Sequence, residues 1–206
     1  AEVLHNNLSK IEASDIHERL NLEKGKYNLT IAHREENIDT EKNFLSLFNA
    51  INKMAEKYDM PILYSCHPRS KKRLETSGFK LDPRVIQHER WDSMTTTAAD
   101  EAYAVVSDSG TLPEERASLQ AWDIRSGHLH TNEHGKTGAL DKGDFILAGI
   151  DERSLLQAVD TAVELNKNND LGIPVPDYVD ENVSTKVVKD HPVVYSVVNK
   201  MVWRKF

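Results

Sequence analysis

Short β-prone segments alternate with amphipathic helical segments along most of this chain, and this alternation constrains the fold more than any other feature. The β-prone segments, rich in branched and aromatic residues, are residues 27–31, 61–65, 85–86, 104–107 and 145–148. Apolar side chains recur near the 3.6-residue helical period in residues 44–54 and 155–165, and Thr40 and Asp151 are placed to cap these helices. The pattern predicts an α/β fold with a doubly wound parallel sheet.

A change of composition near residue 166 divides the chain. Residues 1–166 carry the alternating pattern and are predicted to form one α/β domain. Residues 167–206 begin with a segment rich in Asn, Gly and Pro and end in an apolar helical segment, so a linker and a C-terminal helical tail are predicted. Trp203 is expected to pack this tail on the domain.

Charge and cysteine content exclude several classes of function. The 206 residues carry a net charge of −7, which is unsuitable for binding nucleic acid. No apolar run approaches the roughly 20 residues that span a bilayer, and the first residues lack a signal-peptide pattern, so no membrane partner is expected. The single cysteine, Cys66, excludes an internal disulfide and fits a reducing compartment, so a cytoplasmic location is predicted.

Three polar motifs begin where predicted strands end. They are AHREEN at residues 32–37, CHPR at residues 66–69 and SDSGT at residues 107–111. Ligands of doubly wound sheets bind beyond the carboxyl ends of the strands. We therefore expect the three motifs to open on one edge of the sheet and to form a binding site there.

The SDSGT motif has the pattern of an anion site. A turn of small residues before a helix start leaves backbone N–H groups pointing outward. Gly110 would allow close approach of the backbone to a phosphate, and the hydroxyls of Ser109 and Thr111 would add donors, so a diphosphate is the predicted ligand. A capped helix without a ligand explains the same residues equally well.

The other two motifs supply imidazole and guanidinium groups. His33 is suited to acid–base chemistry near neutral pH, and Arg69 can donate two hydrogen bonds to a phosphate. The alternative is that both histidine motifs are structural. His128, His130 and His134 lie in a segment that we interpret as a Gly- and Asn-containing loop without a fixed scaffold, so no metal site is predicted.

Taken together, these motifs resemble the non-hydrolysing UDP-N-acetylglucosamine 2-epimerase family. The matching segments are YNLTIAHREENID at 27–39, CHPRSKKRL at 66–74, AYAVVSDSGTLPEE at 102–115, DYVDENVSTKVV at 177–188 and VWRK at 202–205. The resemblance implies the two-domain GT-B fold, of which this chain would be the carboxy-terminal, Rossmann-like half. The forms HREEN, HPRS and SDSGT are most similar to the branch that makes UDP-N-acetyl-L-fucosamine for capsule or O-antigen.

The resemblance also implies a reaction and a set of site residues. A UDP-N-acetylhexosamine would lose UDP by elimination and regain it on the epimeric sugar, without a metal or a nicotinamide cofactor. The implied partner is UDP or a UDP-sugar, with a homodimer as the candidate assembly. His33 would be catalytic and assist departure of the diphosphate. The implied substrate-binding residues are Arg34, His67, Arg69, Ser109, Gly110, Thr111, Glu115 and Arg125. Of these, Glu115 would hold the ribose hydroxyls.

Two segments depart from the family pattern. Residues 89–98 replace an aromatic segment that would line the uracil pocket, and residues 126–142 replace an ERPE motif. The carboxylates for proton transfer would also come from an amino-terminal domain that this chain lacks, so the chain alone is expected to be inactive. An inactive or engineered binding scaffold and half of a GT-B glycosyltransferase remain as alternatives.

Overall fold

A six-stranded parallel sheet forms the centre of the computed structural model, which describes residues 2–32, 34–88, 97–99, 101–109, 127–130, 145–168, 170 and 181–204. The strand order is β3-β2-β1-β4-β5-β6. The strands are β1 (Asn28–Ile31), β2 (Ile62–Ser65), β3 (Val85–His88), β4 (Ala104–Ser107), β5 (Gly127–His130) and β6 (Ile146–Leu147). Strand order reverses between β1 and β4, which is the switch point of a doubly wound sheet. The predicted fold class is confirmed.

Helices cover the sheet and extend from both ends of the described chain. They are α1 (Glu2–Asn6), α2 (Leu8–Glu12), α3 (Ile16–Arg19), α4 (Glu35–Ile38), α5 (Glu41–Tyr58), α6 (Pro68–Ser77), α10 (Glu152–Lys167) and α11 (Val183–Met201). The two predicted N-caps are confirmed. The side chain of Thr40 accepts a hydrogen bond from the backbone N–H of Asn43 at 3.2 Å, and that of Asp151 accepts one from Ser154 at 3.0 Å.

Alternating residues of the strands supply the two sides of the core. On one side, residues such as Tyr64 and Val106 pack with the apolar faces of α5 and α10. On the other side, Leu29, Leu63 and Val105 pack in a cluster that includes Ile16 of α3 and the alanines at 98, 99 and 102. Both faces of the sheet are therefore buried, as is typical of parallel sheets. Polar side chains are instead found where the strands end.

The sequence pattern does not predict β5. Residues 127–130 pair in parallel with both β4 and β6, where a loop was expected. A single apolar residue, Leu129, stands between two histidines here, so the segment lacks the apolar run that identifies a buried strand in a sequence. Hydrogen bonds to the strands on both sides stabilise β5, although its sequence carries no apolar run.

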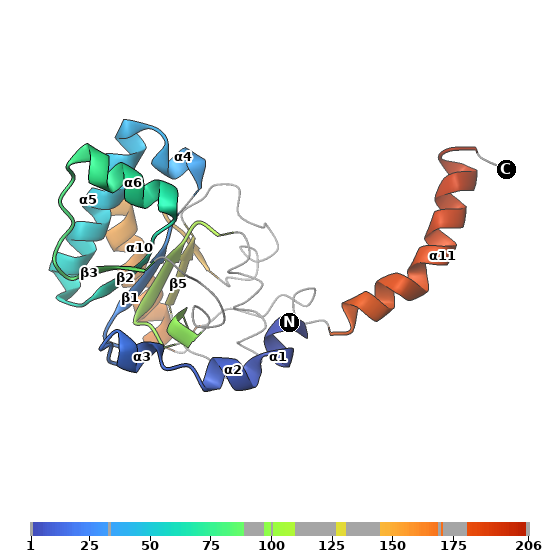
Figure 1. The fold of residues 1–206 in the computed structure, drawn as a ribbon, viewed down its shortest axis with the longest axis horizontal. Coiled ribbons are helices and arrows are strands. Elements are labelled where there is room, and N and C mark those ends of the chain that lie inside the picture. Colours follow the sequence, from blue (N-terminus) through green and yellow to red (C-terminus); the bar gives the residue numbers. More distant parts are fainter. Residues whose placement is uncertain are drawn as a thin grey trace.

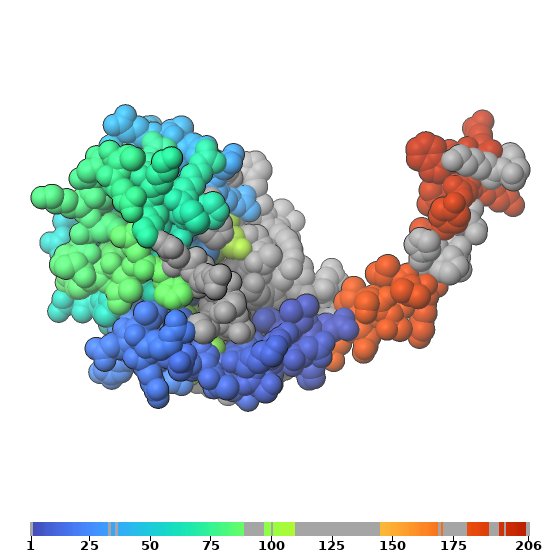
Figure 2. Space-filling view, viewed as in Figure 1, coloured from blue at the N-terminus to red at the C-terminus, as the bar shows by residue number. Residues whose placement is uncertain are grey.

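The carboxy-terminal helix lies differently from the expectation. Helix α11 projects away from the body of the molecule and does not pack on the domain (Figures 1 and 2). Its exposed residues include Val187, Val188, Val194, Tyr195 and Met201, and Trp203 beyond it is 65% exposed. An apolar helical pattern predicts that a helix forms but does not identify the surface that covers it. The division near residue 166 stays a prediction. Within the described residues, no helix is both long and apolar enough to cross a membrane.

Candidate functional site

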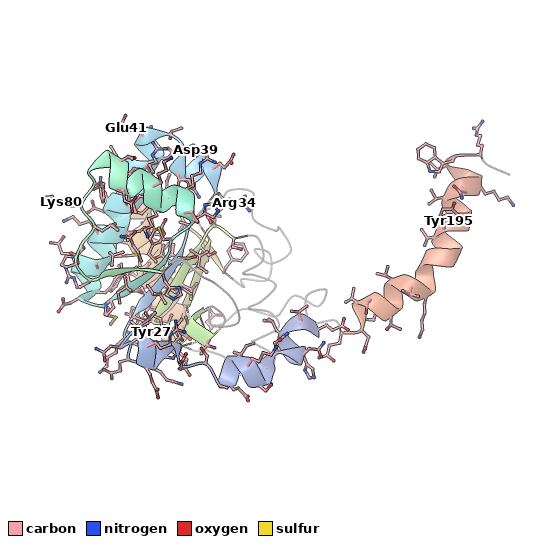
Figure 3. All side chains as sticks on the ribbon, in the orientation of Figure 1. Tyr27, Arg34, Asp39, Glu41, Lys80 and Tyr195 are labelled. Carbon is pink, nitrogen blue, oxygen red and sulfur yellow. The ribbon has the colours of Figure 1, made fainter. Side chains whose placement is uncertain are left out.

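Three adjacent strands end at the same level at one edge of the sheet. Ile31, the last residue of β1, pairs with Ser65 at the end of β2 and with Ser107 at the end of β4. The three polar motifs therefore leave the sheet side by side, as predicted. Figure 3 shows Arg34 at this edge and Tyr27 at the opposite end of β1. We call this edge the strand-end site.

Arg34 and Asp108 connect the segments that follow β1 and β4. The backbone N–H of Arg34 donates to Oδ2 of Asp108 at 2.9 Å, and Nε of Arg34 donates to the carbonyl oxygen of Asp108 at 2.6 Å. Nδ2 of Asn37 donates to the same Oδ2 at 3.0 Å. Asp108 is fully buried, and Asn37 is buried beside it. These hydrogen bonds join the segments after β1 and β4.

Tyr64, on the neighbouring strand β2, fixes the backbone directly after β1. Its hydroxyl donates to the carbonyl oxygen of Ala32 at 3.2 Å, next to the position of His33 in the chain. Burial raises the pKa of Tyr64, so the hydroxyl stays neutral and keeps its proton for this bond. The carbonyl before His33 is therefore fixed by a side chain of β2.

His67 and Pro68 start helix α6 directly after β2. Nδ1 of His67 accepts a hydrogen bond from the backbone N–H of Arg69 at 3.3 Å, and Pro68 occupies the first turn. Cys66 is buried between strand and helix. His67 thus has a capping role in this structure, and its predicted role in substrate binding stays a prediction.

Arg69 contacts carboxylates of the neighbouring segment. Its guanidinium donates to Glu35 at 2.7 Å and to Asp39 at 2.9 Å, so it spans both ends of α4. Arg73, one turn later, donates to the carbonyl oxygens of Ile38 and Asp39. The predicted contact of Arg69 with a phosphate stays a prediction, and the observed contacts position α4 against α6.

The structure describes only residues 107–109 of the SDSGT motif. The backbone N–H of Ser109 donates to Oγ of Ser107 at 2.9 Å, which turns the chain sharply after β4. The remaining predicted site residues lie outside the described residues: His33, Gly110, Thr111, Glu115 and Arg125. In the part of the chain that the structure describes, no cluster of three or more His, Cys, Asp or Glu side chains could hold a metal ion.

Two of the residues that join the strand-end segments were not predicted from the sequence. Asp108 and Asn37 stand inside motifs that were recognised, yet neither received a role. The sequence did contain a signal for Asp108. Its carboxylate stands inside the predicted anion site, and a negatively charged side chain is not expected to bind an anion. A buried acceptor for the neighbouring segment explains such a residue.

The fold and the strand-end site together define a class of protein domain. A doubly wound parallel sheet with polar motifs after β1, β2 and β4 is typical of nucleotide-binding α/β domains. The structure of UDP-N-acetylglucosamine 2-epimerase from Rickettsia bellii is similar, with a TM-score of 0.81 and 30% identity over 98% of this chain and 54% of that one. A structure of the Methanocaldococcus jannaschii enzyme in complex with UDP-GlcNAc and UDP has a TM-score of 0.72 and 22% identity, over 89% of this chain and 51% of that one.

Sequence comparison identifies the family. The sequence model of the family described as UDP-N-acetylglucosamine 2-epimerase matches residues 1–190. The UDP-N-acetylglucosamine 2-epimerase of Methanococcus maripaludis is 30% identical over 155 residues, which are 71% of this chain and 41% of that protein. This chain therefore belongs to the UDP-N-acetylglucosamine 2-epimerase family. It spans about half the length of the relatives that it matches.

Proposed function

We propose that this chain is the UDP-binding half of an epimerase that acts on UDP-N-acetylhexosamines. The observation that carries this proposal is the meeting of Arg34, His67 and Ser109 at the ends of three adjacent strands. The family supports the identity of the ligand, since a relative is described in complex with UDP-GlcNAc and UDP.

In this proposal the strand-end site binds the diphosphate of UDP. Arg34 and Arg69 supply positive charge, and the backbone after Ser109, through Gly110 and Thr111, supplies N–H donors. Glu115 accepts from the ribose hydroxyls, and Arg125 and His67 complete the contacts. His33, one residue before Arg34, is the group that assists departure of UDP from the sugar.

In the same proposal, epimerisation also requires residues that this chain does not contain. Proton transfer at C2 of the sugar requires carboxylates from an amino-terminal domain, and no metal or nicotinamide takes part. We propose the cytoplasm as the location and a homodimer as the assembly. The product is UDP-N-acetyl-L-fucosamine, for capsule or O-antigen, if the chain follows the branch that its motifs resemble.

Calorimetry with UDP tests the proposal on the purified chain. Gly110→Val puts a branched side chain where the phosphate must approach, and His33→Ala removes a charge-assisted contact. Each is expected to weaken UDP binding about tenfold or more. His5→Ala is the matched control, since His5 lies on α1 and pairs with Glu181. UDP affinity that is unchanged by Gly110→Val contradicts the proposed site.

Activity is tested separately, because binding and turnover require different parts of the protein. An NMR time course with UDP-N-acetylglucosamine is expected to show no epimer formed by this chain alone. Epimer formation at an enzymatic rate would refute the assignment of the proton transfer to an amino-terminal domain. Absence of UDP binding would favour the alternative of an inactive scaffold.

A further inference from the structure

We propose that Asp108 is a positioning residue, which holds the segment with His33 and Arg34 in register with Ser109 so that both segments bind one anion as a preformed unit. The identity of the anion as the diphosphate of UDP rests on the proposed function. The coupling of the two segments rests on contacts of this chain and can be tested without any nucleotide.

Burial is the first argument for this role. A carboxylate that is fully removed from water is costly unless hydrogen bonds compensate it. The side chain of fully buried Asp108 accepts from the backbone N–H of Arg34 and from Nδ2 of Asn37, which both lie in the segment after β1. The buried carboxylate on β4's end therefore specifies the position of the neighbouring segment.

Helix α4 provides the second argument. It has four residues, and Arg34 at its N-cap makes no side-chain capping bond. So short a helix is unstable by itself, because its first turn fixes several residues for very few hydrogen bonds. Asp108 supplies, from another strand, the acceptor at the helix start that a capping side chain would otherwise supply. Removal of this acceptor should release α4 at its first turn.

The backbone bonds of Asp108 provide the third argument. Its N–H donates to the carbonyl oxygen of Ile31 at 2.9 Å, which extends the pairing of β1 and β4 by one residue. Its carbonyl oxygen accepts from Nε of Arg34 at 2.6 Å. Ser109 follows directly in the chain. A displacement of Arg34 would therefore displace the start of the predicted phosphate loop with it.

Charge distinguishes positioning from direct ligand binding. A carboxylate near an anion repels it, so Asp108 cannot raise anion affinity by its charge. One oxygen, Oδ2, accepts both the Arg34 and the Asn37 bonds. Asp108→Asn retains an acceptor oxygen and removes the charge, whereas Asp108→Ala removes the acceptor. Positioning therefore predicts that Asn preserves the site and Ala does not.

The experiment uses the intact chain and four variants. They are Asp108→Ala, Asp108→Asn, the milder Asn37→Ala, and Asp82→Ala as the matched control. Asp82 also accepts a backbone N–H and an arginine side chain, but it precedes β3 and so lies at the opposite end of the sheet. Residue-resolved amide exchange by NMR and calorimetry with UDP and with inorganic pyrophosphate are measured on each.

We expect Asp108→Ala to speed amide exchange at Arg34 and residues 35–38 by about tenfold or more, with a similar loss of affinity for UDP and pyrophosphate. Asp108→Asn should restore most of both. Asn37→Ala should show a smaller effect of the same kind, and it decides the exchange result if Asp108→Ala does not fold. Asp82→Ala should lower thermal stability without changing either quantity in the folded protein.

Two results would overturn the proposal. One is exchange in residues 34–38 that is no faster in the Asp108 and Asn37 variants than in the Asp82 control. The other is a destabilised Asp108→Ala that binds UDP with normal affinity, since that outcome assigns Asp108 a purely structural role. Wild-type chain that binds neither UDP nor pyrophosphate would refute the proposed function, and the exchange result alone would then decide whether the two segments are coupled.

Discussion

Replacement of Thr30 by valine should stabilise this protein. Thr30 lies in the middle of β1, on the side of the sheet that faces α5 and α10, and it is fully buried. Its register partners are Tyr64 and Val106, both part of the core on that side. Among the residues that the structure describes, no group forms a hydrogen bond with the Thr30 hydroxyl.

The size of the effect follows from this burial. A buried hydroxyl without a partner costs about 1–3 kcal/mol relative to water. Valine has nearly the same shape as threonine and at least an equal preference for strands, so the packing against Tyr64 and Val106 should persist. We expect the free energy of unfolding to rise by about 1 kcal/mol, which is a gain of about 2–4 °C in Tm for a chain of this length.

The assay is urea and thermal unfolding of wild type, Thr30→Val and a matched control, Thr97→Val. The hydroxyl of Thr97 donates to the carbonyl oxygen of Ile11 at 2.7 Å, so its removal should destabilise the protein by about 1 kcal/mol. The two substitutions are chemically identical and should have opposite signs. A Thr30→Val protein that is less stable than wild type would show that the hydroxyl has a partner, such as a buried water, and would refute the reasoning.

Three further predictions concern single residues. Hydrogen bonds from Arg84 hold the pKa of Asp82 at about 2, below its unfolded value of 3.8. These bonds therefore stabilise the folded protein fully above about pH 4, and this stabilisation is lost as pH falls towards 2. Urea unfolding at several pH values should show that the stability of Asp82→Asn depends less on pH than that of the wild type. A Cβ on Gly149 would lie 2.9 Å from Oδ2 of Asp151, so Gly149→Ala should disturb the cap of α10 and lower stability by about 1 kcal/mol in thermal melts. Arg69→Ala should cost less than about 1 kcal/mol in urea unfolding, because Arg69 is 53% exposed.

Much of the fold could be predicted because local patterns agree with the final packing. The stripe of α5, for example, contains Phe44, Phe48 and Ile51, all buried in the structure. Helix caps such as Thr40 are read from the sequence because donor and acceptor lie three residues apart. Strand β5 was missed because its place between β4 and β6 depends on pairing with distant segments, which leaves no periodic pattern in four residues.

The candidate site could be located from the sequence, but the partners of its side chains could not. Its location follows from topology, since parallel strands place every residue after a carboxyl end at one edge. The partner of a charged side chain depends on which segment lies next to it. Arg69 contacts Glu35 and Asp39, which are 34 and 30 residues away in the chain, and its expected contact with a phosphate stays a prediction.

These contacts bear on how an anion would enter the strand-end site. Arg69 already has two carboxylate partners, and an anion that binds it must compete with both. Arg34 is different, because its backbone N–H and Nε are held by Asp108 and its position is therefore set before any ligand arrives. Preorganised side chains lose little freedom on binding, so they contribute more affinity than side chains that must first be repositioned. For that reason Arg34, rather than Arg69, is the arginine whose position best suits a preformed anion site.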